Sequence, residues 1–366
     1  MNRNEKKLSP LMLIPAMACM VPILVMAIIY YVNITVKTET PLPTPTPKAV
    51  QSAEVTKAPE KEADPTASPT PTNTPTPTLT PTPTFTPTPT FTPTPTPTPG
   101  LKELSREQNY YDTRKETVLA KLSAGEYEEL SNTGKNWSFK RVKDHQKAGN
   151  WAPFDITEYD CFYLDKDADE KAEDKVIYLT LDCGYPTKNT AKMLDVFKEK
   201  DVHVTFFCTK MFLEKSVDMV KRMRDEGHNI GNHTCTHQYL TKISSEEVVE
   251  EITGFEERLY ELAGMTPDPF FRCPGGNYSP KVLQMIKDLG YSTYQWSIAY
   301  GDYDKDNQPT VEYVVDHIKE NYHNGAIILM HNDSPANVEA MPAVIDMLRE
   351  EGFTFGNLYD FMTDEN

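Results

Sequence analysis

Short apolar segments alternate with helical patterns over the C-terminal half of the chain, and this alternation constrains the fold more than any other feature. The first apolar segment spans residues 176–185, is rich in β-branched and aromatic residues, and ends in Asp182-Cys183-Gly184-Tyr185. Six more segments of strand length follow at 202–208, 228–233, 269–272, 291–296, 326–331 and 353–355. Helical patterns separate them at 187–200, 216–226, 244–263, 280–289, 311–321 and 336–350. Such alternation predicts an α/β fold of parallel strands wrapped by helices.

Polar residues recur where the predicted strands end. Asp182, His233, Arg272 and His331 each stand at or beside the C-terminal end of a different strand. Enzymes with a (β/α) barrel present their catalytic groups at that end. The pattern therefore favours a barrel over an open doubly wound sheet, and seven readable strands make the barrel an incomplete one.

The N-terminal segment 11–32 is almost entirely apolar. Its 22 residues, at roughly 1.5 Å each, are long enough to cross a bilayer core of about 30 Å. Arg3, Lys6 and Lys7 precede it, which places residues 1–10 in the cytoplasm and the rest outside. The run exceeds the apolar part of a signal peptide and lacks a small-residue cleavage site after it. We expect an uncleaved single-pass anchor in the cell membrane.

A Thr/Pro-rich linker follows at residues 33–100. More than half of the 30 prolines lie in it, and such a sequence favours polyproline II and forms no core. We expect an extended stalk, then a helical and aromatic extension at 101–170 and a catalytic domain at 171–366. The formal net charge of -17 argues against nucleic acid as a partner.

The motif His233-Thr-Cys-Thr-His237 is the sharpest local signal. Histidines four apart converge on one metal ion if the backbone turns helically, although two surface histidines with no ligand show the same spacing. Here the pair follows Gly231-Asn232 at a predicted strand end, in register with Asp182, and this context favours a metal site.

Two further strand ends carry groups suited to acyl chemistry. Arg272 precedes Cys273-Pro274-Gly275-Gly276, a turn whose backbone N–H groups are able to stabilise an oxyanion. His331 ends an apolar strand, and histidine is suited to protonating a leaving amine at neutral pH. After the fifth strand, Trp296 either walls a small acyl pocket or packs in the core, and Asp302 is available to orient a histidine.

Together these motifs resemble those of the polysaccharide deacetylases, the NodB-homology family or carbohydrate esterase family 4. The matching residues, in order and spacing, are Asp182, His233-x-x-x-His237, Arg272-x-Pro274, Trp296-Ser297, Asp302 and Leu329-x-His331. The resemblance covers residues 131–362. The segment 136–141 is similar to the one ahead of the barrel in the delta-lactam-biosynthetic (muramoyl) de-N-acetylases of the PdaA type.

The resemblance implies a deformed seven-stranded (β/α) barrel that removes acetyl groups from N-acetylated amino sugars. It makes Asp182 the general base that activates water, with Arg272 positioning it. His331 is then the general acid for the departing amine. Asp302 is the candidate partner of either His331 or Arg272, because Ala299 stands where the family often has an aspartate.

The resemblance also implies a metal and an acetyl pocket. His233 and His237 would hold a divalent metal, with zinc expected, that polarises the acetyl carbonyl and the water. The substrate-facing positions are Tyr185, Gly275, Trp296 and Leu329.

Cys183 is the main departure from the family pattern. The family usually has a second aspartate there as the third metal ligand, and the PdaA-type enzymes also lack it. Cys183 either ligates zinc as a thiolate, giving a Cys-His-His site, or lies beside a weakly bound metal. A disulfide among Cys183, Cys208, Cys235 and Cys273 is a third possibility.

The sequence therefore predicts a membrane-anchored, extracytoplasmic peptidoglycan N-acetylmuramic acid deacetylase, a hydrolase of linear amides that releases acetate. One alternative is the same chemistry on N-acetylglucosamine units of peptidoglycan or another amino-sugar polymer. Another is a catalytically inactive wall-binding module, against which the presence of both Asp182 and His331 argues.

Overall fold

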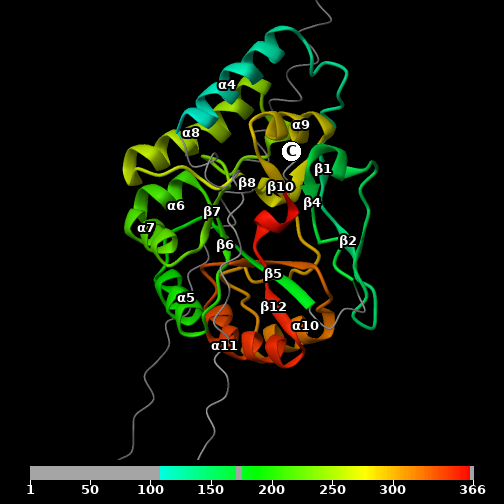
Figure 1. Cartoon of the computed structure of the whole chain (residues 1–366), viewed down its shortest axis with the longest axis vertical. Helices are drawn as coiled ribbons and strands as arrows, with labels where there is room; N and C mark the ends of the chain where they lie inside the picture. Colours follow the sequence, from blue (N-terminus) through cyan, green and yellow to red (C-terminus); the bar gives the residue numbers. More distant parts are fainter. Residues whose placement is uncertain (1–107, 170–174, 363–366) are drawn as a thin grey trace, which may run out of the picture. The chain divides into compact units, whose positions relative to one another are not determined.

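An incomplete barrel of parallel strands forms the centre of the molecule in the computed structural model, which describes residues 108–169 and 175–362 (Figure 1). The strand order is β11 (Ala326–His331), β5 (Lys175–Cys183), β6 (Thr205–Cys208), β7 (Asn229–Asn232), β8 (Phe270–Phe271), β10 (Ser292–Tyr294) and β4 (Cys161–Phe162). An eighth strand, β12 (Phe353–Phe355), also pairs with β5, and all these pairs are parallel. A parallel bridge between Ile298 and Ile328 links the chain after β10 to β11, so the sheet curls towards closure.

The seven predicted strands are all present, but the prediction of seven omitted β4. That strand has two residues and lies within the aromatic extension, ahead of the strand–helix alternation that predicted the others. It pairs with the outer side of β10 and makes the sheet eight-stranded.

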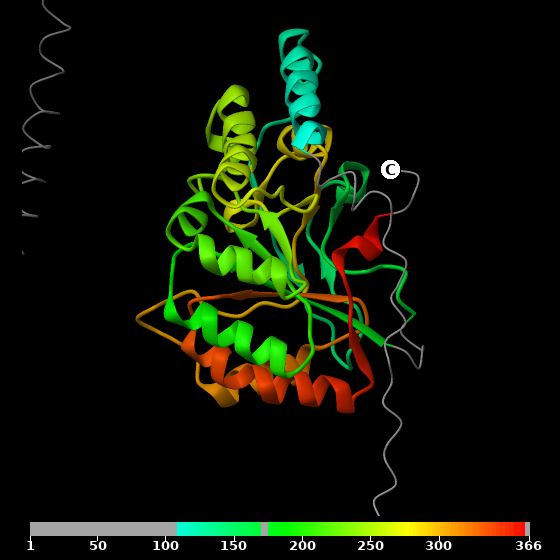
Figure 2. The ribbon, with the colours of Figure 1, turned by 60° about the vertical axis from the view of Figure 1, so that its left-hand side comes forward.

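Helices lie on the outside of the sheet, as the alternation predicted (Figure 2). The six predicted helices are α5 (Lys188–Glu199), α7 (Val217–Asp225), α8 (Ser245–Ala263), α9 (Pro280–Asp288), α10 (Val311–Asn321) and α11 (Pro335–Glu350). A short helix, α6 (Lys210–Lys215), was not predicted. Neighbouring helices contact one another around the outside in the order α10, α11, α5, α7, α8 and α9.

The N-terminal extension packs on this barrel. Its helix α4 (Gln108–Ser123) lies against α8 and α9. Lys115 forms an ion pair with Glu257 at 2.9 Å, and the ring of Tyr111 stacks on that of Tyr291 with centroids 5.3 Å apart. The rest of the extension forms short pieces: β1 (Lys135–Asn136), β2 (Phe139–Lys140), β3 (Gly149–Asn150) and the 3-10 helix η1 (Ile156–Tyr159).

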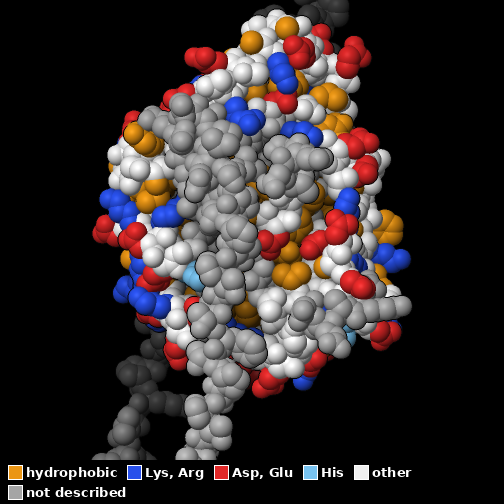
Figure 3. Space-filling model, viewed as in Figure 1, with side chains coloured by type: hydrophobic (Ala, Val, Ile, Leu, Met, Phe, Trp, Pro, Cys, Tyr) orange, Lys and Arg blue, Asp and Glu red, His pale blue; other side chains and the backbone are white. Residues whose placement is uncertain are grey.

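The predicted cytoplasmic N-terminus, the anchor at 11–32 and the Thr/Pro linker at 33–100 lie outside the described residues. Within the described ranges, no helix has the length and apolar character needed to cross a bilayer. Around the edge of the face shown in Figure 3, acidic and basic side chains are interspersed.

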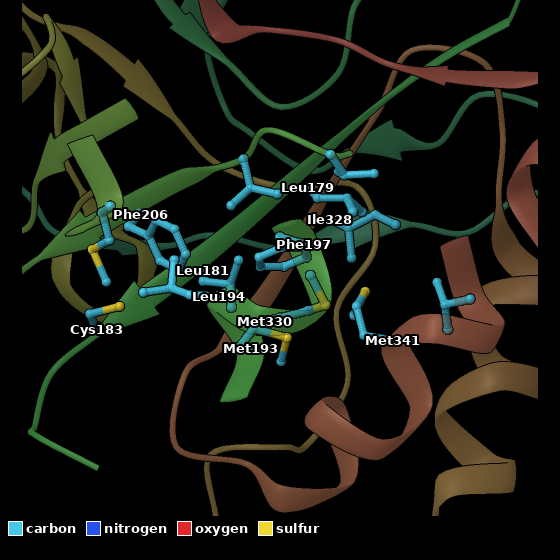
Figure 4. Packing of buried hydrophobic residues seen from close by; sticks show 14 of the residues in the cluster. Leu179, Leu181, Cys183, Met193, Leu194, Phe197, Phe206, Ile328, Met330 and Met341 are labelled. Atoms are coloured by element: carbon cyan, nitrogen blue, oxygen red, sulfur yellow. The ribbon is translucent and has the colours of Figure 1, made fainter. Parts of the chain in front are cut away.

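The alternation of side chains along β5 separates an inner face from an outer one. Tyr178 points inward and packs with Phe207, Phe270 and Tyr294 from the other strands, and η4 (Leu358–Phe361) adds to this inner cluster. Leu181 and its odd-numbered neighbours belong to the outer cluster beneath α5 and α11 (Figure 4). Because successive side chains of a strand point to opposite faces, Asp182 points inward.

Candidate active site

A cavity of about 540 Å³ opens at the C-terminal ends of the strands. Most of the predicted site residues line it: Asp182, Tyr185, His233, His237, Gly275, Trp296, Leu329 and His331. Arg272 and Asp302 lie behind this lining, where each holds a residue that faces the cavity. Cys183 is not among the lining residues.

Asp182 is fixed at the end of β5 by Arg272. The Arg272 Nη1 donates a hydrogen bond of 2.8 Å to Asp182 Oδ1, which leaves Oδ2 directed towards His233 Nε2 at 3.5 Å. Burial alone would raise the pKa of Asp182, but the Arg272 guanidinium, with smaller contributions from His233 and His331, outweighs burial and holds that pKa below its usual range. Asp182 is therefore a carboxylate at neutral pH, with one oxygen free for chemistry.

Arg272 is itself held rigidly. Its guanidinium is fully buried and lies 4.1 Å from the centre of the Phe207 ring, while Nε donates to the Tyr294 carbonyl at 2.9 Å. Nη2 has no hydrogen-bond partner among the described residues. An arginine fixed in this way serves to orient Asp182 and to balance its charge.

The two histidines of the motif sit on a tight loop after β7. Thr234 and His237 both adopt left-handed backbone conformations, with φ of 70° and 61°. The Thr234 hydroxyl accepts a hydrogen bond from the His237 N–H at 3.0 Å, and Asn232 Oδ1 accepts one from the Thr234 N–H at 2.9 Å. These bonds bring the two imidazole rings within 4.8 Å of each other, measured between centroids.

These histidines fit a divalent metal in ligand type and protonation state. The His233 Nδ1 bonds to the Arg272 carbonyl at 2.8 Å, which leaves Nε2 as the free nitrogen, a common arrangement for a ligating histidine. Burial lowers the pKa of His233 to about 4, and it also lowers the pKa of His237. Both rings are therefore neutral at pH 7. Within residues 108–169 and 175–362, no third His, Cys, Asp or Glu completes a metal-binding group.

Cys183 does not supply that third ligand, so the Cys-His-His alternative is wrong. Its side chain points outward from β5 into the apolar cluster, one residue out of phase with Asp182 (Figure 4). It is fully buried beside Cys208, its register partner on β6. Burial, and then the neighbouring Cys208, raise the pKa of the Cys183 thiol well above its usual value, so it is a neutral thiol. The described cysteines are all free, and no disulfide is formed.

His331 faces the cavity from the end of β11 and is paired with Asp302. Its Nδ1 lies 2.8 Å from Asp302 Oδ1, and its backbone N–H donates to Asp302 Oδ2 at 2.7 Å. Of the two partners considered from sequence, Asp302 thus serves His331 and not Arg272. Burial would lower the pKa of His331, but the hydrogen bond and charge of Asp302 raise it above its usual value. Asp302 therefore favours the protonated form of His331, whose Nε2 is the nitrogen not held by Asp302.

Sequence reasoning missed the residues that hold Asp302. Asn337 on α11 donates to Asp302 Oδ2 at 2.7 Å and to the His331 carbonyl at 3.2 Å. Tyr300 in turn donates to Asn337 Oδ1 at 2.9 Å. Asn337 lies three residues after the helix-capping Ser334, and no spacing in the sequence ties it to a site on another strand.

The turn after Arg272 brings the backbone close to the cavity. Gly275 has φ of 58°, and a Cβ there would stand 2.8 Å from the Tyr239 ring, so this position requires glycine. Trp296 and Leu329 line the same region. The indole of Trp137, in the segment ahead of the barrel, donates to the Trp296 carbonyl at 2.9 Å and so helps to fix this wall.

Exposed aromatic side chains frame the mouth of the cavity. Tyr185, Tyr239 and Tyr303 are 56%, 43% and 66% exposed and all line it, together with Met211. Only Tyr185 was predicted. Exposed aromatic faces at a cavity mouth suit the apolar faces of sugar rings, and these tyrosines line the same cavity as Asp182 and His331. The arrangement has the groups needed for hydrolysis of an acylated amine.

Comparisons with known proteins identify the family. A family model described as polysaccharide deacetylase matches residues 169–294. The peptidoglycan-N-acetylmuramic acid deacetylase PdaA of Bacillus subtilis (strain 168) is 38% identical over 250 residues, which cover 68% of this chain and 93% of that protein. A peptidoglycan-N-acetylglucosamine deacetylase of Bacillus cereus is 32% identical over 185 residues, 50% of this chain and 85% of the relative.

A solved structure of the B. subtilis PdaA, described as a family 4 carbohydrate esterase, superimposes with a TM-score of 0.60 and 38% identity. It covers 65% of this chain and 100% of that chain. The chain therefore belongs to the polysaccharide deacetylase family, hydrolases that act on N-acetyl amides.

Proposed function

We propose that this protein is a membrane-anchored, extracytoplasmic peptidoglycan deacetylase that removes the acetyl group from N-acetylmuramic acid. One observation carries the enzymatic part: Asp182 and His331 line the same cavity, and each is oriented by a buried partner, Arg272 and Asp302 respectively. The sugar is inferred from the 38% identity to a relative that is named for N-acetylmuramic acid.

The proposed chemistry assigns the two reacting protons to specific atoms. Asp182 Oδ2, the oxygen not held by Arg272, accepts the proton of the attacking water. His331 Nε2, the nitrogen not held by Asp302, donates a proton to the amine as the C–N bond breaks. The Gly275 N–H is the candidate donor to the oxyanion, and Trp296 and Leu329 enclose the acetyl methyl group.

His233 and His237 are the residues that would hold a metal ion. Members of the family are generally metal-dependent, and a bound divalent ion would polarise the acetyl carbonyl and lower the pKa of the water. Because only two protein ligands are present among the described residues, we expect such an ion to bind weakly and to be removed readily by a chelator.

The location is inferred from the N-terminal sequence. Basic residues at 1–10, an apolar stretch at 11–32 and a Thr/Pro-rich segment at 33–100 are the features of an anchored protein whose catalytic domain stands away from the membrane. At about 3.1 Å per residue, a polyproline II linker of this length would reach well into a cell wall.

A second candidate substrate is N-acetylglucosamine within peptidoglycan. It is favoured by the 32% identity to a B. cereus relative named for that activity, over 85% of the relative's length. The chemistry at Asp182 and His331 is the same for both sugars, so the choice depends on contacts at the cavity mouth.

Acetate release by the full-length protein in detergent tests these proposals. The substrates are muramoyl oligosaccharides and chitin oligomers, assayed before and after chelation and after addition of zinc. Asp182→Asn should be inactive, while Asp316→Asn, which makes the same charge change at an exposed position on α10, should match the wild type. Release from muramoyl substrates alone, lost on chelation and restored by zinc, supports the proposal.

The other outcomes separate the alternatives. Release only from chitin oligomers would transfer the assignment to N-acetylglucosamine. Chelator-resistant release would remove the metal from the mechanism. A wild-type protein that binds wall material but releases no acetate from any substrate would be a binding module.

A further inference from the structure

The loop between Asp302 and Gln308 is fixed to the barrel and overhangs the cavity. Gln308 Nε2 donates to the backbone carbonyls of Asp302 and Asp304, at 2.7 Å each. Its Oε1 accepts a hydrogen bond of 2.7 Å from the hydroxyl of Ser334, the residue that caps α11. The start of the loop is held by Asp302, which bonds to His331. The loop is thus tied to the catalytic acid at one end and to α11 at the other.

Lys305 lies at the tip of this loop and lines the cavity. Its ammonium group stands 5.2 Å from the centre of the Tyr185 ring, on the segment that follows the base Asp182. Nothing in the described part of the chain forms an ion pair with it. The adjacent Asp304 instead accepts a hydrogen bond from the backbone N–H of Asp306, within the loop.

Lys305 differs from the carboxylates that line the cavity in being positively charged. It is the one lysine or arginine among the lining residues. The lining carboxylates are Asp182, whose charge is balanced by Arg272, and Asp333. An anionic group entering with the substrate would be attracted to Lys305 and repelled by Asp333.

We propose that Lys305 determines specificity by binding a carboxylate that the glycan carries close to the acetylated amine. This inference rests on the proposed function and deepens it. Muramic acid differs from glucosamine by a lactyl ether at the neighbouring carbon, and that ether ends in a carboxyl group. In a glycan without peptides this carboxylate is free. Where a stem peptide is attached, the lactyl group is an amide and the peptide supplies the carboxylates. Lys305 recognises the charge common to both.

Steady-state kinetics of acetate release by the full-length protein test this proposal with four substrates. They are a peptide-free muramoyl oligosaccharide, the same oligosaccharide with its lactyl carboxylates converted to methylamides, one that keeps its stem peptides, and a chitin oligomer. The variants are Lys305→Met and Lys305→Arg. Lys319→Met, which removes the same charge from an exposed position on α10, is the matched control.

Lys305→Met is expected to raise KM about fivefold for the peptide-free muramoyl substrate, with kcat unchanged, as for one partly exposed ion pair. The increase should disappear at high salt and with the methylamide substrate. Lys305→Arg should keep most of the wild-type KM, and Lys319→Met should be indistinguishable from the wild type. An effect confined to the stem-peptide substrate would identify the peptide as the source of the carboxylate.

The inference is overturned if Lys305→Met impairs charged and uncharged substrates equally, since that is the result of a disturbed loop. It is also overturned if the variant matches the wild type throughout. Failure of the proposed function is recognised from the wild-type protein and not from the variants. If the wild type released no acetate from any muramoyl substrate, both proposals would be wrong.

Discussion

His233 and His331 face the same cavity, yet their surroundings shift their pKa values in opposite directions. His233 is buried and its Nδ1 bonds to a neutral backbone carbonyl, so burial dominates and lowers its pKa to about 4. The Nδ1 of His331 bonds to the carboxylate of Asp302, which outweighs burial and raises its pKa. A quarter of the His331 side chain is also exposed, against 2% for His233.

The comparison shows that the hydrogen-bond partner of Nδ1 determines the task to which each ring is suited. A carbonyl acceptor leaves a neutral imidazole with a free Nε2, which suits metal ligation. A carboxylate acceptor stabilises the imidazolium, which suits proton donation. Two histidines that are alike in sequence are thereby suited to different tasks, metal ligation for His233 and proton donation for His331.

The largest expected effect comes from removing the acid. His331→Ala should lower kcat for acetate release by about 10²- to 10⁴-fold, the range typical of a general acid. Substrate binding, measured by equilibrium dialysis with the same glycan, should change little. His203→Ala, at an exposed position outside the cavity lining, is the control. A kcat within about twofold of the wild type would contradict the assignment of His331.

An intermediate effect is expected from Asp302→Asn, which removes the partner that distinguishes His331 from His233. Proton donation by His331 requires its protonated form, so under the proposed mechanism kcat should fall as pH rises through a pKa above the usual value of about 6.5. Without the charge of Asp302 that pKa should drop, and the alkaline limb of the kcat profile should move to lower pH. An unmoved alkaline limb would show that another group controls it.

The smallest effect is expected at Cys183, which tests whether His233 and His237 have a thiolate co-ligand. Cys183→Ala removes a buried sulfur, so we expect a loss of about 1 kcal/mol in the free energy of unfolding. Because the thiol points away from the cavity, zinc stoichiometry and kcat should remain those of the wild type. Loss of bound zinc in this variant, measured by atomic absorption, would contradict the position of the Cys183 side chain in the apolar cluster away from the cavity.

Much of the barrel could be predicted from sequence because its strands and helices are local patterns. The segment 326–331 is strand β11 with the same bounds, and the capped helices begin within a residue or two of where their patterns begin. Asp182, His233 and His331 were found because strand ends converge in a barrel. The outward position of Cys183 could also be predicted from sequence, because adjacent residues of a strand point to opposite faces and Asp182 points inward.

Other features depend on contacts between segments far apart in the chain. The choice of His331 as the partner of Asp302 is fixed by Asn337, which bonds to both and lies on a different element. Lys305 lies in a loop whose position is set by Gln308 and Ser334, and no periodic pattern marks such a residue. The predicted seven strands omitted β4 because its two residues lie in the aromatic extension, outside the strand–helix alternation.

The left-handed backbone at Thr234 and His237 has a consequence for the evolution of this sequence. A β-branched residue in that conformation lowers the free energy of unfolding by about 1–3 kcal/mol. The hydrogen bonds accepted by Asn232 Oδ1 and by the Thr234 hydroxyl offset part of this cost. Selection for hydrolysis and selection for robustness therefore act against each other in this loop. In a lineage that no longer needed the reaction, substitutions that relieve this backbone conformation would stabilise the protein. Such substitutions would therefore accumulate in the loop before they accumulate in the barrel around it.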